Sequence, residues 1–291
     1  MKQITIGHHT GSRCAFMDMS GRFKPKVWGG TFRMGDRAAA YLWVAEWRKR
    51  NPNDRIIVID DPFKGDAVDA LNLDAVWLFS GVADQIWMME RKDEHIERPK
   101  AYPLYHTNLW RIWLWLRSNR TVEPTIRPKP ESMERARQLL KDCKVPAKFM
   151  TVQPLFDAGY NRGRNAPIPW WRAVTEQLKS KYPVVMLGSH AVAQQFQPMA
   201  GVYPLWEHRL SPMDSLALLS MSAAHLGGET GLTLWSAMFK RPTLAAYSRW
   251  GTTTSHFPMD CRPIPMGAPV EHVPLGGDSR HVLAKAEKMM C

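Results

Sequence analysis

Short β-forming runs alternate with segments of helical periodicity along this chain, and this alternation constrains the fold more than any other feature. The run at residues 55–60 has Ile-Ile-Val-Ile at its centre and no polar face, which is typical of a strand buried on both sides of a parallel sheet. Parallel strands need crossover connections, which the helical segments supply. The alternation therefore predicts an α/β protein in which helices cover parallel sheets.

The first series of elements lies before residue 120. Residues 2–6 predict a first strand, and the Gly-, Arg- and Lys-rich stretch that follows, up to residue 30, predicts a loop. Apolar side chains recur at helical spacing over residues 36–50 and stop at Asn51-Pro52, which predicts a helix. Further strands are expected at residues 55–60, 75–79 and 83–88.

A proline-rich segment, residues 121–131, is typical of an interdomain linker and leads to a second series. Helices are expected there at residues 132–143, 169–181, 212–221 and 231–239. Strands are expected at residues 149–152, 183–188, 223–226 and 243–247. Two Rossmann-like domains, residues 1–130 and 131–291, are the simplest architecture that accounts for both series.

Composition places the chain among globular proteins without a membrane span. Apolar residues make up 45% of the chain and charged residues 23%, which is enough for a sizeable core. No apolar run approaches the roughly 18 residues of a spanning helix, and the N-terminus begins with a strand pattern rather than a signal sequence. The scattered cysteines have no metal spacing, so we expect free thiols, no metal site and a cytoplasmic protein.

The segment at residues 227–233, Gly-Gly-Glu-Thr-Gly-Leu-Thr, lies between a predicted strand and a predicted helix. Glycines let the backbone approach a ligand closely, and a helix start offers free amides and a positive dipole end. Thr230 and Thr233 add hydroxyl donors, and Glu229 is able to accept from a sugar hydroxyl. These residues suit a diphosphate, although a simple turn with Thr230 as helix N-cap explains them equally.

Two other turns carry polar residues in comparable places. Arg162 and Arg164 follow the strand expected at residues 149–152, where they either hold phosphates or are ordinary solvated arginines. Asp36, in the segment Phe-Arg-Met-Gly-Asp, opens the first long helix. A carboxylate in that place either complements the helix dipole or faces a cleft as a general base.

Together these segments resemble the bacterial ADP-heptose:lipopolysaccharide heptosyltransferases, from about residue 31 to residue 247. The resemblance implies a GT-B fold, in which two Rossmann-like domains face each other across a cleft. Residues 1–130 would hold the acceptor and residues 131–291 the nucleotide sugar, and it stays open whether the last helix returns to the N-terminal domain. Asp36, preceded by Met34-Gly35, matches the catalytic aspartate proposed for that family.

The resemblance also implies a donor site. Members of the family place a basic residue before a Trp-Pro-x-x-x-Trp segment, matched here by Arg164 before Pro167 and Trp171. A strand that ends in Gly-Ser and an Asp-Thr-Gly-x-x-His segment before a helix are matched by Gly188-Ser189 and by residues 229–234. The expected donor-binding residues are Arg162, Arg164, Gly188, Ser189, Gly228, Glu229, Thr230, Gly231 and Thr233.

Four departures from the family pattern are visible. Ala166 stands in place of the first tryptophan and Glu229 in place of aspartate. Leu234 replaces the histidine, which removes a polar contact near the phosphates. Asp36 also lies farther from the N-terminus than usual, because a basic segment comes before it.

The chain has a net charge of +12, which either points to a polyanionic partner or is a generic solubilising surplus, and the basic segment carries part of it. Only Asp18 and Asp36 oppose its positive charges, so we expect a positive patch, Arg37 included, on the acceptor side. The expected acceptor-binding residues are Arg13, Arg22, Lys24, Lys26 and Arg33.

These residues predict an inverting, metal-independent sugar transfer that needs no cofactor beyond the nucleotide-sugar co-substrate. Asp36 would deprotonate the acceptor hydroxyl, and Arg164 with the Thr230-Gly231 amides would stabilise the departing diphosphate. No Asp-x-Asp segment occurs in a suitable loop, so no metal is expected.

The acceptor has two candidates. Duplex DNA with hydroxymethylated pyrimidines, which certain phage enzymes of GT-B fold modify, fits the basic segment and the surplus of Trp and Arg and is slightly favoured. The location would then be the cytoplasm of a host cell. A phosphorylated lipopolysaccharide core or another anionic glycan would use the same arginines. A third hypothesis is a non-catalytic module that binds nucleic acid or glycans on a GT-B scaffold.

Overall fold

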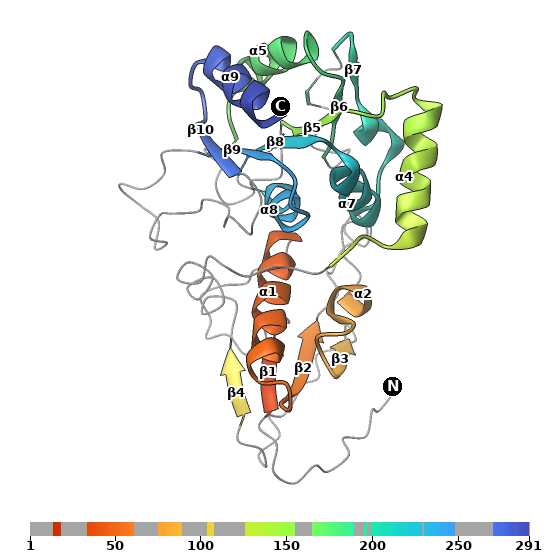
Figure 1. The fold of residues 1–291 in the computed structure, drawn as a ribbon, viewed down its shortest axis with the longest axis vertical. Coiled ribbons are helices and arrows are strands. Elements are labelled where there is room, and N and C mark those ends of the chain that lie inside the picture. Colours follow the sequence, from red (N-terminus) through yellow and green to blue (C-terminus); the bar gives the residue numbers. More distant parts are fainter. Residues whose placement is uncertain are drawn as a thin grey trace.

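Two parallel β-sheets with their helices make up the protein, one in each half of the chain (Figure 1). The structure, a computed structural model, describes residues 14–18, 34–60, 75–88, 104–107, 126–154, 165–188, 195–196, 199–228, 230–247 and 270–290. The α/β class with parallel sheets, predicted from the alternation of strand and helix patterns, is confirmed.

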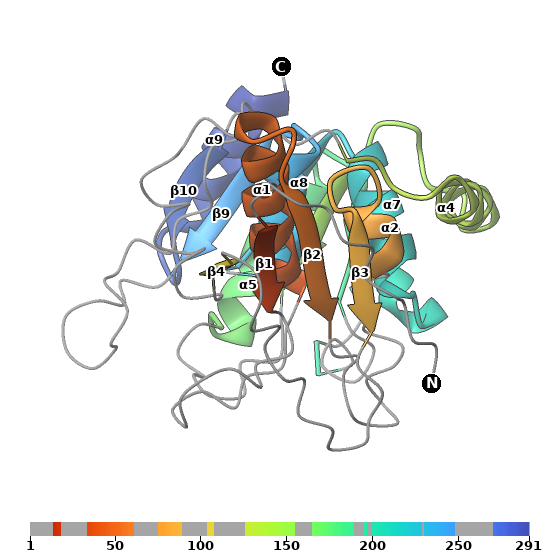
Figure 2. The same cartoon turned by 90° about the horizontal axis from the view of Figure 1, so that it is seen from below.

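The N-terminal sheet has the strand order β3-β2-β1-β4, and Figure 2 shows β3, β2 and β1 side by side. All of its strand pairs are parallel. The strands are β1 (Cys14–Asp18), β2 (Arg55–Asp60), β3 (Gln85–Met88) and β4 (Leu104–Thr107). The long helix α1 (Met34–Arg50) follows β1, and the short helix α2 (Ala75–Phe79) precedes β3.

Two predictions for this half are wrong. Residues 14–18, predicted as loop, form β1 between β2 and β4. The sequence pattern does not reveal this strand, because its short apolar core lies among glycines and arginines. Residues 75–79, predicted as a strand, form α2, whose single turn buries Leu78 and Phe79. A short apolar run does not by itself distinguish strand from helix. The strand predicted at residues 2–6 lies outside the described residues.

The C-terminal sheet has the strand order β10-β9-β8-β5-β6-β7, again entirely parallel. The chain runs from β5 outward through β6 and β7, then returns to β8 on the other side of β5. The strands are β5 (Met150–Gln153), β6 (Val184–Met186), β7 (Val202–Tyr203), β8 (Ala224–Gly227), β9 (Thr243–Tyr247) and β10 (Val270–Pro274). The four strands predicted for this half are confirmed within a few residues, and β7 and β10 are additional.

Helices cover both faces of this sheet. On one face, α5 (Ile168–Lys179) packs against α9 (Ser279–Met290), where Gln177 Nε2 donates to Ser279 Oγ at 2.8 Å. The chain's last helix thus stays with the C-terminal sheet. The other face carries α7 (Pro212–Met221) and α8 (Gly231–Met238), and α4 (Pro130–Asp142) packs on α7. The short 3₁₀ helix η3 (Leu205–His208) follows β7 in the chain.

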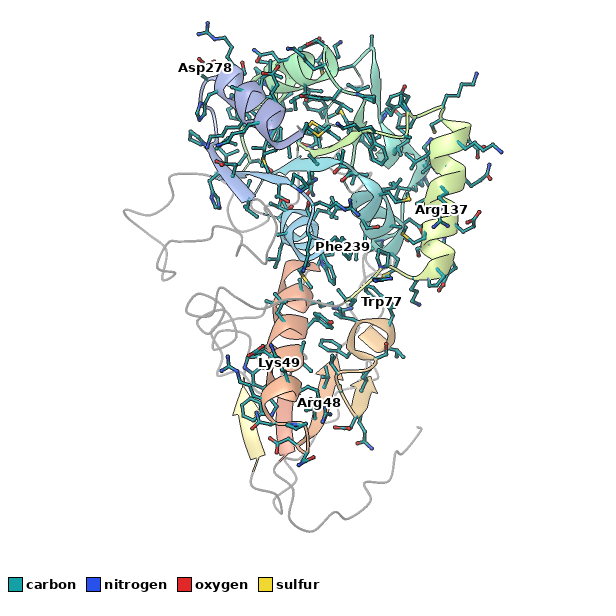
Figure 3. The ribbon with its side chains drawn as sticks, viewed as in Figure 1. Arg48, Lys49, Trp77, Arg137, Phe239 and Asp278 are labelled. Carbon is teal, nitrogen blue, oxygen red and sulfur yellow. The ribbon has the colours of Figure 1, made fainter. Side chains whose placement is uncertain are left out.

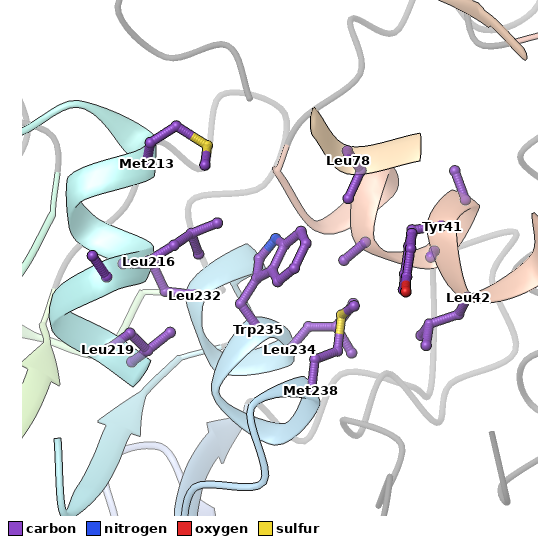
Figure 4. Close-up of a cluster of buried hydrophobic side chains, with 14 of the residues drawn as sticks. Tyr41, Leu42, Leu78, Met213, Leu216, Leu219, Leu232, Leu234, Trp235 and Met238 are labelled. Atoms are coloured by element: carbon purple, nitrogen blue, oxygen red, sulfur yellow. The ribbon is translucent and has the colours of Figure 1, made fainter. Parts of the chain in front are cut away.

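The two halves share one apolar core, formed where α8 and α7 meet α1 and α2 (Figure 4). Trp235 of α8 is fully buried in it. Its ring centroid lies 6.1 Å from that of Trp77 on α2 and 5.6 Å from that of Phe239. Figure 3 shows Trp77 and Phe239 at the boundary between the halves. Tyr41, Leu42, Leu78, Leu216, Leu219, Leu232, Leu234 and Met238 belong to the same cluster.

Candidate functional site

The carboxyl ends of β5 and β8 mark the point where the chain switches direction across the C-terminal sheet. Ligands of open α/β sheets bind at such switch points. The two strands are neighbours, with Gln153 paired to Gly227 at their ends. The segment that links β8 to α8, which we call the Gly-rich turn (residues 227–231), begins there. Topology therefore brings the predicted diphosphate-binding turn to the crevice of the sheet.

Thr230 is the N-cap of α8. Its backbone is extended (φ −126°, ψ 166°), and its side-chain oxygen accepts from the amide of Thr233 at 3.3 Å. The same hydroxyl donates to Gln153 Oε1 at 2.5 Å, so its only proton is already used within the protein. The amides of Gly231 and Leu232 in the first turn have no acceptor within the described part of the chain. These amides, rather than the Thr230 hydroxyl, are available to an anion.

Beneath the turn lies a buried polar network. Thr233 is fully buried, and its hydroxyl donates to the Gly228 carbonyl at 2.7 Å instead of facing the crevice. It also lies 3.4 Å from Nε2 of the buried His225, whose Nδ1 is 3.0 Å from Thr151 Oγ1. Gly227 is required here, because a Cβ at that position would lie 2.5 Å from both His225 Nε2 and Thr233 Oγ1. The geometry favours a role for Thr233 in holding the turn.

His225 is neutral in the folded protein. Burial, which removes the ring from solvent, lowers the pKa of His225 from 6.5 to about 3, against a smaller opposing effect of a hydrogen bond to Thr151. The unfolded chain therefore binds more protons than the folded chain between these two pH values. Stability is retained above about pH 6.5 and is lost as the pH falls towards 3.

We expect His225→Gln to flatten this acid limb. Between pH 6.5 and 3, wild type should lose up to about 1.4 kcal/mol of unfolding free energy per pH unit beyond what the variant loses. Urea unfolding followed across this range measures the difference. His281→Gln, at an exposed histidine of α9, is the matched control and should keep the wild-type slope. Parallel slopes in wild type and His225→Gln would contradict a buried neutral imidazole.

The start of α1 touches the start of α8. A Cβ built on Gly231 would lie 2.7 Å from both the Gly35 nitrogen and Met34 Cβ, so the two backbones meet with no room for a side chain. Trp235 Nε1 donates to the Met34 carbonyl at 3.1 Å and fastens the contact. Asp36 is the next residue of α1, although its side chain lies outside the description. The structure thus brings together the Met-Gly-Asp and Thr-Gly segments. In the sequence, Asp36 and Gly231 are 195 positions apart.

Leu234 stands where the resembled family has histidine. It is 4% exposed and packs in the core shared by the two halves, beside Met238 and near Leu42 (Figure 4). A histidine in this apolar environment would be buried without the solvation its polar ring needs. The leucine is therefore the residue that this junction favours, and the departure follows from packing.

The other predicted site residues are only partly placed. Gly188 ends the segment after β6 with φ 150°, a conformation that favours glycine. Arg37 is 2% exposed, so it does not belong to a surface patch, contrary to the prediction. The remaining predicted residues lie outside the described residues: Arg162, Arg164, Ser189 and Glu229 of the donor set, and Arg13, Arg22, Lys24, Lys26 and Arg33 of the acceptor set.

Sequence reasoning named Gln153 only as the start of the segment that leads to Arg162 and Arg164, gave it no role, and missed His225 as part of the site. Each is a polar residue in a short strand that is buried throughout, Met-Thr-Val-Gln and Ala-His-Leu-Gly. A buried strand without a polar face has no need of such residues, so their presence was the available signal.

Within the described residues, no group of three or more His, Cys, Asp or Glu side chains is arranged to hold a metal ion. Cys143 Sγ and His208 Nε2 lie 3.5 Å apart as a hydrogen-bonded pair on the surface. The described helices also include none with the length and apolar character that crossing a lipid bilayer demands.

Two solved glycosyltransferase structures share the fold of this chain. The glycosyl transferase family 9 protein of Veillonella parvula matches with a TM-score of 0.62 at 11% identity, over 96% of this chain and 97% of that one. Escherichia coli ADP-heptose lipopolysaccharide heptosyltransferase II matches with a TM-score of 0.58 at 11% identity, over 95% and 98%. By sequence alone, no protein-family model and no curated protein matches. At the level of fold, the predicted GT-B class and the resemblance to heptosyltransferases are confirmed.

Proposed function

We propose that this protein is a glycosyltransferase that moves a sugar from a nucleotide-sugar donor to an acceptor hydroxyl. The contact between Gly35 and Gly231 is the observation that carries the proposal. It sets the helix start that contains Asp36 beside the helix start that follows the Gly-rich turn. Two positive dipole ends converge there, and an anion bound beside this contact would relieve their repulsion.

The donor is proposed to lie against residues 131–291, with residues 1–130 as the acceptor side. Its diphosphate would accept from the amides of Gly231 and Leu232, near the carboxyl ends of β5 and β8. Gly188 lies at the next strand end of the same sheet. Arg162, Arg164, Ser189 and Glu229 are proposed to complete the donor site.

The chemistry is proposed to be a direct, inverting displacement without a metal. Asp36 takes the proton of the acceptor hydroxyl, whose oxygen attacks the anomeric carbon as the bond to the diphosphate breaks. The leaving diphosphate gains negative charge, which the amides of α8 and the arginine of position 164 stabilise. The buried network beneath the turn keeps those amides in place before the reaction begins.

The acceptor is proposed to be an anionic glycan, such as a phosphorylated lipopolysaccharide core, and the donor an ADP-sugar. The fold shared with an ADP-heptose lipopolysaccharide heptosyltransferase supports this choice. DNA with hydroxymethylated pyrimidines, which the basic segment favours when taken alone, has no support from the comparisons. The basic residues at 13, 22, 24, 26 and 33 would bind the phosphates of a glycan by the same charge-assisted hydrogen bonds.

A donor-and-acceptor panel tests the proposal. We expect ADP to bind with a dissociation constant between about 1 μM and 1 mM, the range in which substrates of enzymes are commonly bound. Mass spectrometry should then detect sugar added to a phosphorylated core oligosaccharide from an ADP-sugar. Duplex DNA with 5-hydroxymethylcytosine serves as the alternative acceptor, and a mass gain there would restore the DNA hypothesis. No binding of ADP, UDP or GDP would refute a nucleotide-sugar enzyme.

A further inference from the structure

Gln153 links the end of β5 to the N-cap of α8 by a hydrogen bond. It is the last residue of β5, and its Oε1 accepts the hydroxyl of Thr230, which lies 77 positions later in the chain. Only 7% of Gln153 is exposed, so its amide is held among neighbours rather than in solvent. Gln153 is not among the residues predicted to bind the donor.

The hydrogen bonds of Thr230 leave its side chain one orientation. Its oxygen accepts from the Thr233 amide while its proton goes to Gln153, so both capacities of the hydroxyl are engaged at once. Thr233 is fixed in turn by its own bond to the Gly228 carbonyl. Without the acceptor on Gln153, the hydroxyl proton would no longer be fixed in direction, and the cap of α8 would lose this hydrogen bond to β5.

We propose that Gln153 is a positioning residue, which holds Thr230 and thereby aims the Gly231 and Leu232 amides at the donor's diphosphate. This inference rests on the proposed function. Gln153 acts through Thr230 and need not touch the substrate. Its loss should weaken donor binding and leave acceptor binding unchanged, whereas a residue that only stabilises the fold would affect neither selectively.

A double-mutant cycle on ADP affinity tests the proposal. Gln153→Met keeps the volume and removes the acceptor, and Thr230→Val removes the hydroxyl. Each single change should weaken ADP binding by about fivefold, the equivalent of one hydrogen bond. The double variant should bind ADP no more weakly than Thr230→Val alone, because that change already removes the hydrogen bond to Gln153. Thr230→Ser keeps both hydrogen-bonding capacities and should restore wild-type affinity.

The matched control is Gln177→Met on α5, where Gln177 bonds Ser279 of α9 away from the switch point. It should leave ADP affinity and both KM values unchanged. Gln153→Met should raise the KM of the donor about fivefold with an unaltered acceptor KM. Additive losses in the cycle, or unchanged ADP affinity in a Gln153→Met protein whose circular dichroism matches wild type, would overturn the proposal. Wild-type protein that binds no nucleoside diphosphate would overturn the proposed function first, and is recognised before any variant is made.

Discussion

Gly231→Ala is expected to lower the rate of sugar transfer by about two orders of magnitude, while Gly35→Ala leaves it within a few-fold of wild type. A methyl group at Gly231 would lie 2.7 Å from the Gly35 nitrogen, which is backbone and does not yield. The starts of α1 and α8 must then move apart. Displacements of about 1 Å between reacting groups cost on the order of 10²-fold in rate.

Gly35→Ala is the matched control for this contact. Its Cβ would lie 3.4 Å from the Gly231 Cα, an ordinary van der Waals distance, so the same pair of helices accommodates a methyl group from the other side. Thermal unfolding of both variants separates activity from stability, and overpacking at Gly231 should cost about 1–3 kcal/mol. Equal turnover of the two alanine variants would show that the helix contact does not set the geometry of the reaction.

The elements of the C-terminal half were predictable because their patterns are long and well separated. The strands β5, β8 and β9 and the helices α4, α5, α7 and α8 lie within a few residues of the predicted positions. The N-terminal half was less accessible. Its central strand, β1, is a five-residue segment among charged and glycine-rich neighbours, and it becomes a strand by pairing with β2 and β4. That pairing is a tertiary property, which local propensity does not reveal.

The candidate site was predictable in its motifs but not in its contacts. The sequence placed Thr230 and Gly231 at a helix start, which the structure bears out. It predicted that the hydroxyls of Thr230 and Thr233 donate to a diphosphate. In the structure these hydroxyls donate to Gln153 and to the Gly228 carbonyl instead. Such partners come from strands far apart in sequence, and only the sheet order decides which of them meet.

The shared core limits movement of the two halves relative to each other. Leu234 and Trp235 of α8 pack with Leu42 of α1 in one cluster, so separating the halves would expose apolar surface. The cost of such exposure is about 25 cal/mol per Å². The junction therefore favours a fixed arrangement of the two helix starts, which keeps the proposed general base at a constant distance from the proposed diphosphate site.

Asp36→Asn is expected to reduce the transfer rate by about 10²–10⁴-fold while ADP affinity stays near that of wild type. An amide does not accept the acceptor's proton, and loss of a general base typically costs this much. Asp36 is the third residue of α1, so its charge also complements the helix dipole. The dipole contribution is only about 0.3–1 kcal/mol and affects unfolding rather than the chemical step.

Comparing rate, ADP affinity and stability in one variant therefore separates the two roles of Asp36. A helix-start residue would show a small loss of stability and near wild-type turnover, which is also the result expected of a non-catalytic module on this scaffold. A general base would show the large loss of rate with the same small change in stability. Glu46→Gln is the matched control, since it removes a different carboxylate from the same helix. The Glu46 carboxylate pairs with Arg50 at 2.6 Å. It should leave transfer unchanged, because its ion pair lies towards the far end of α1, away from Gly231.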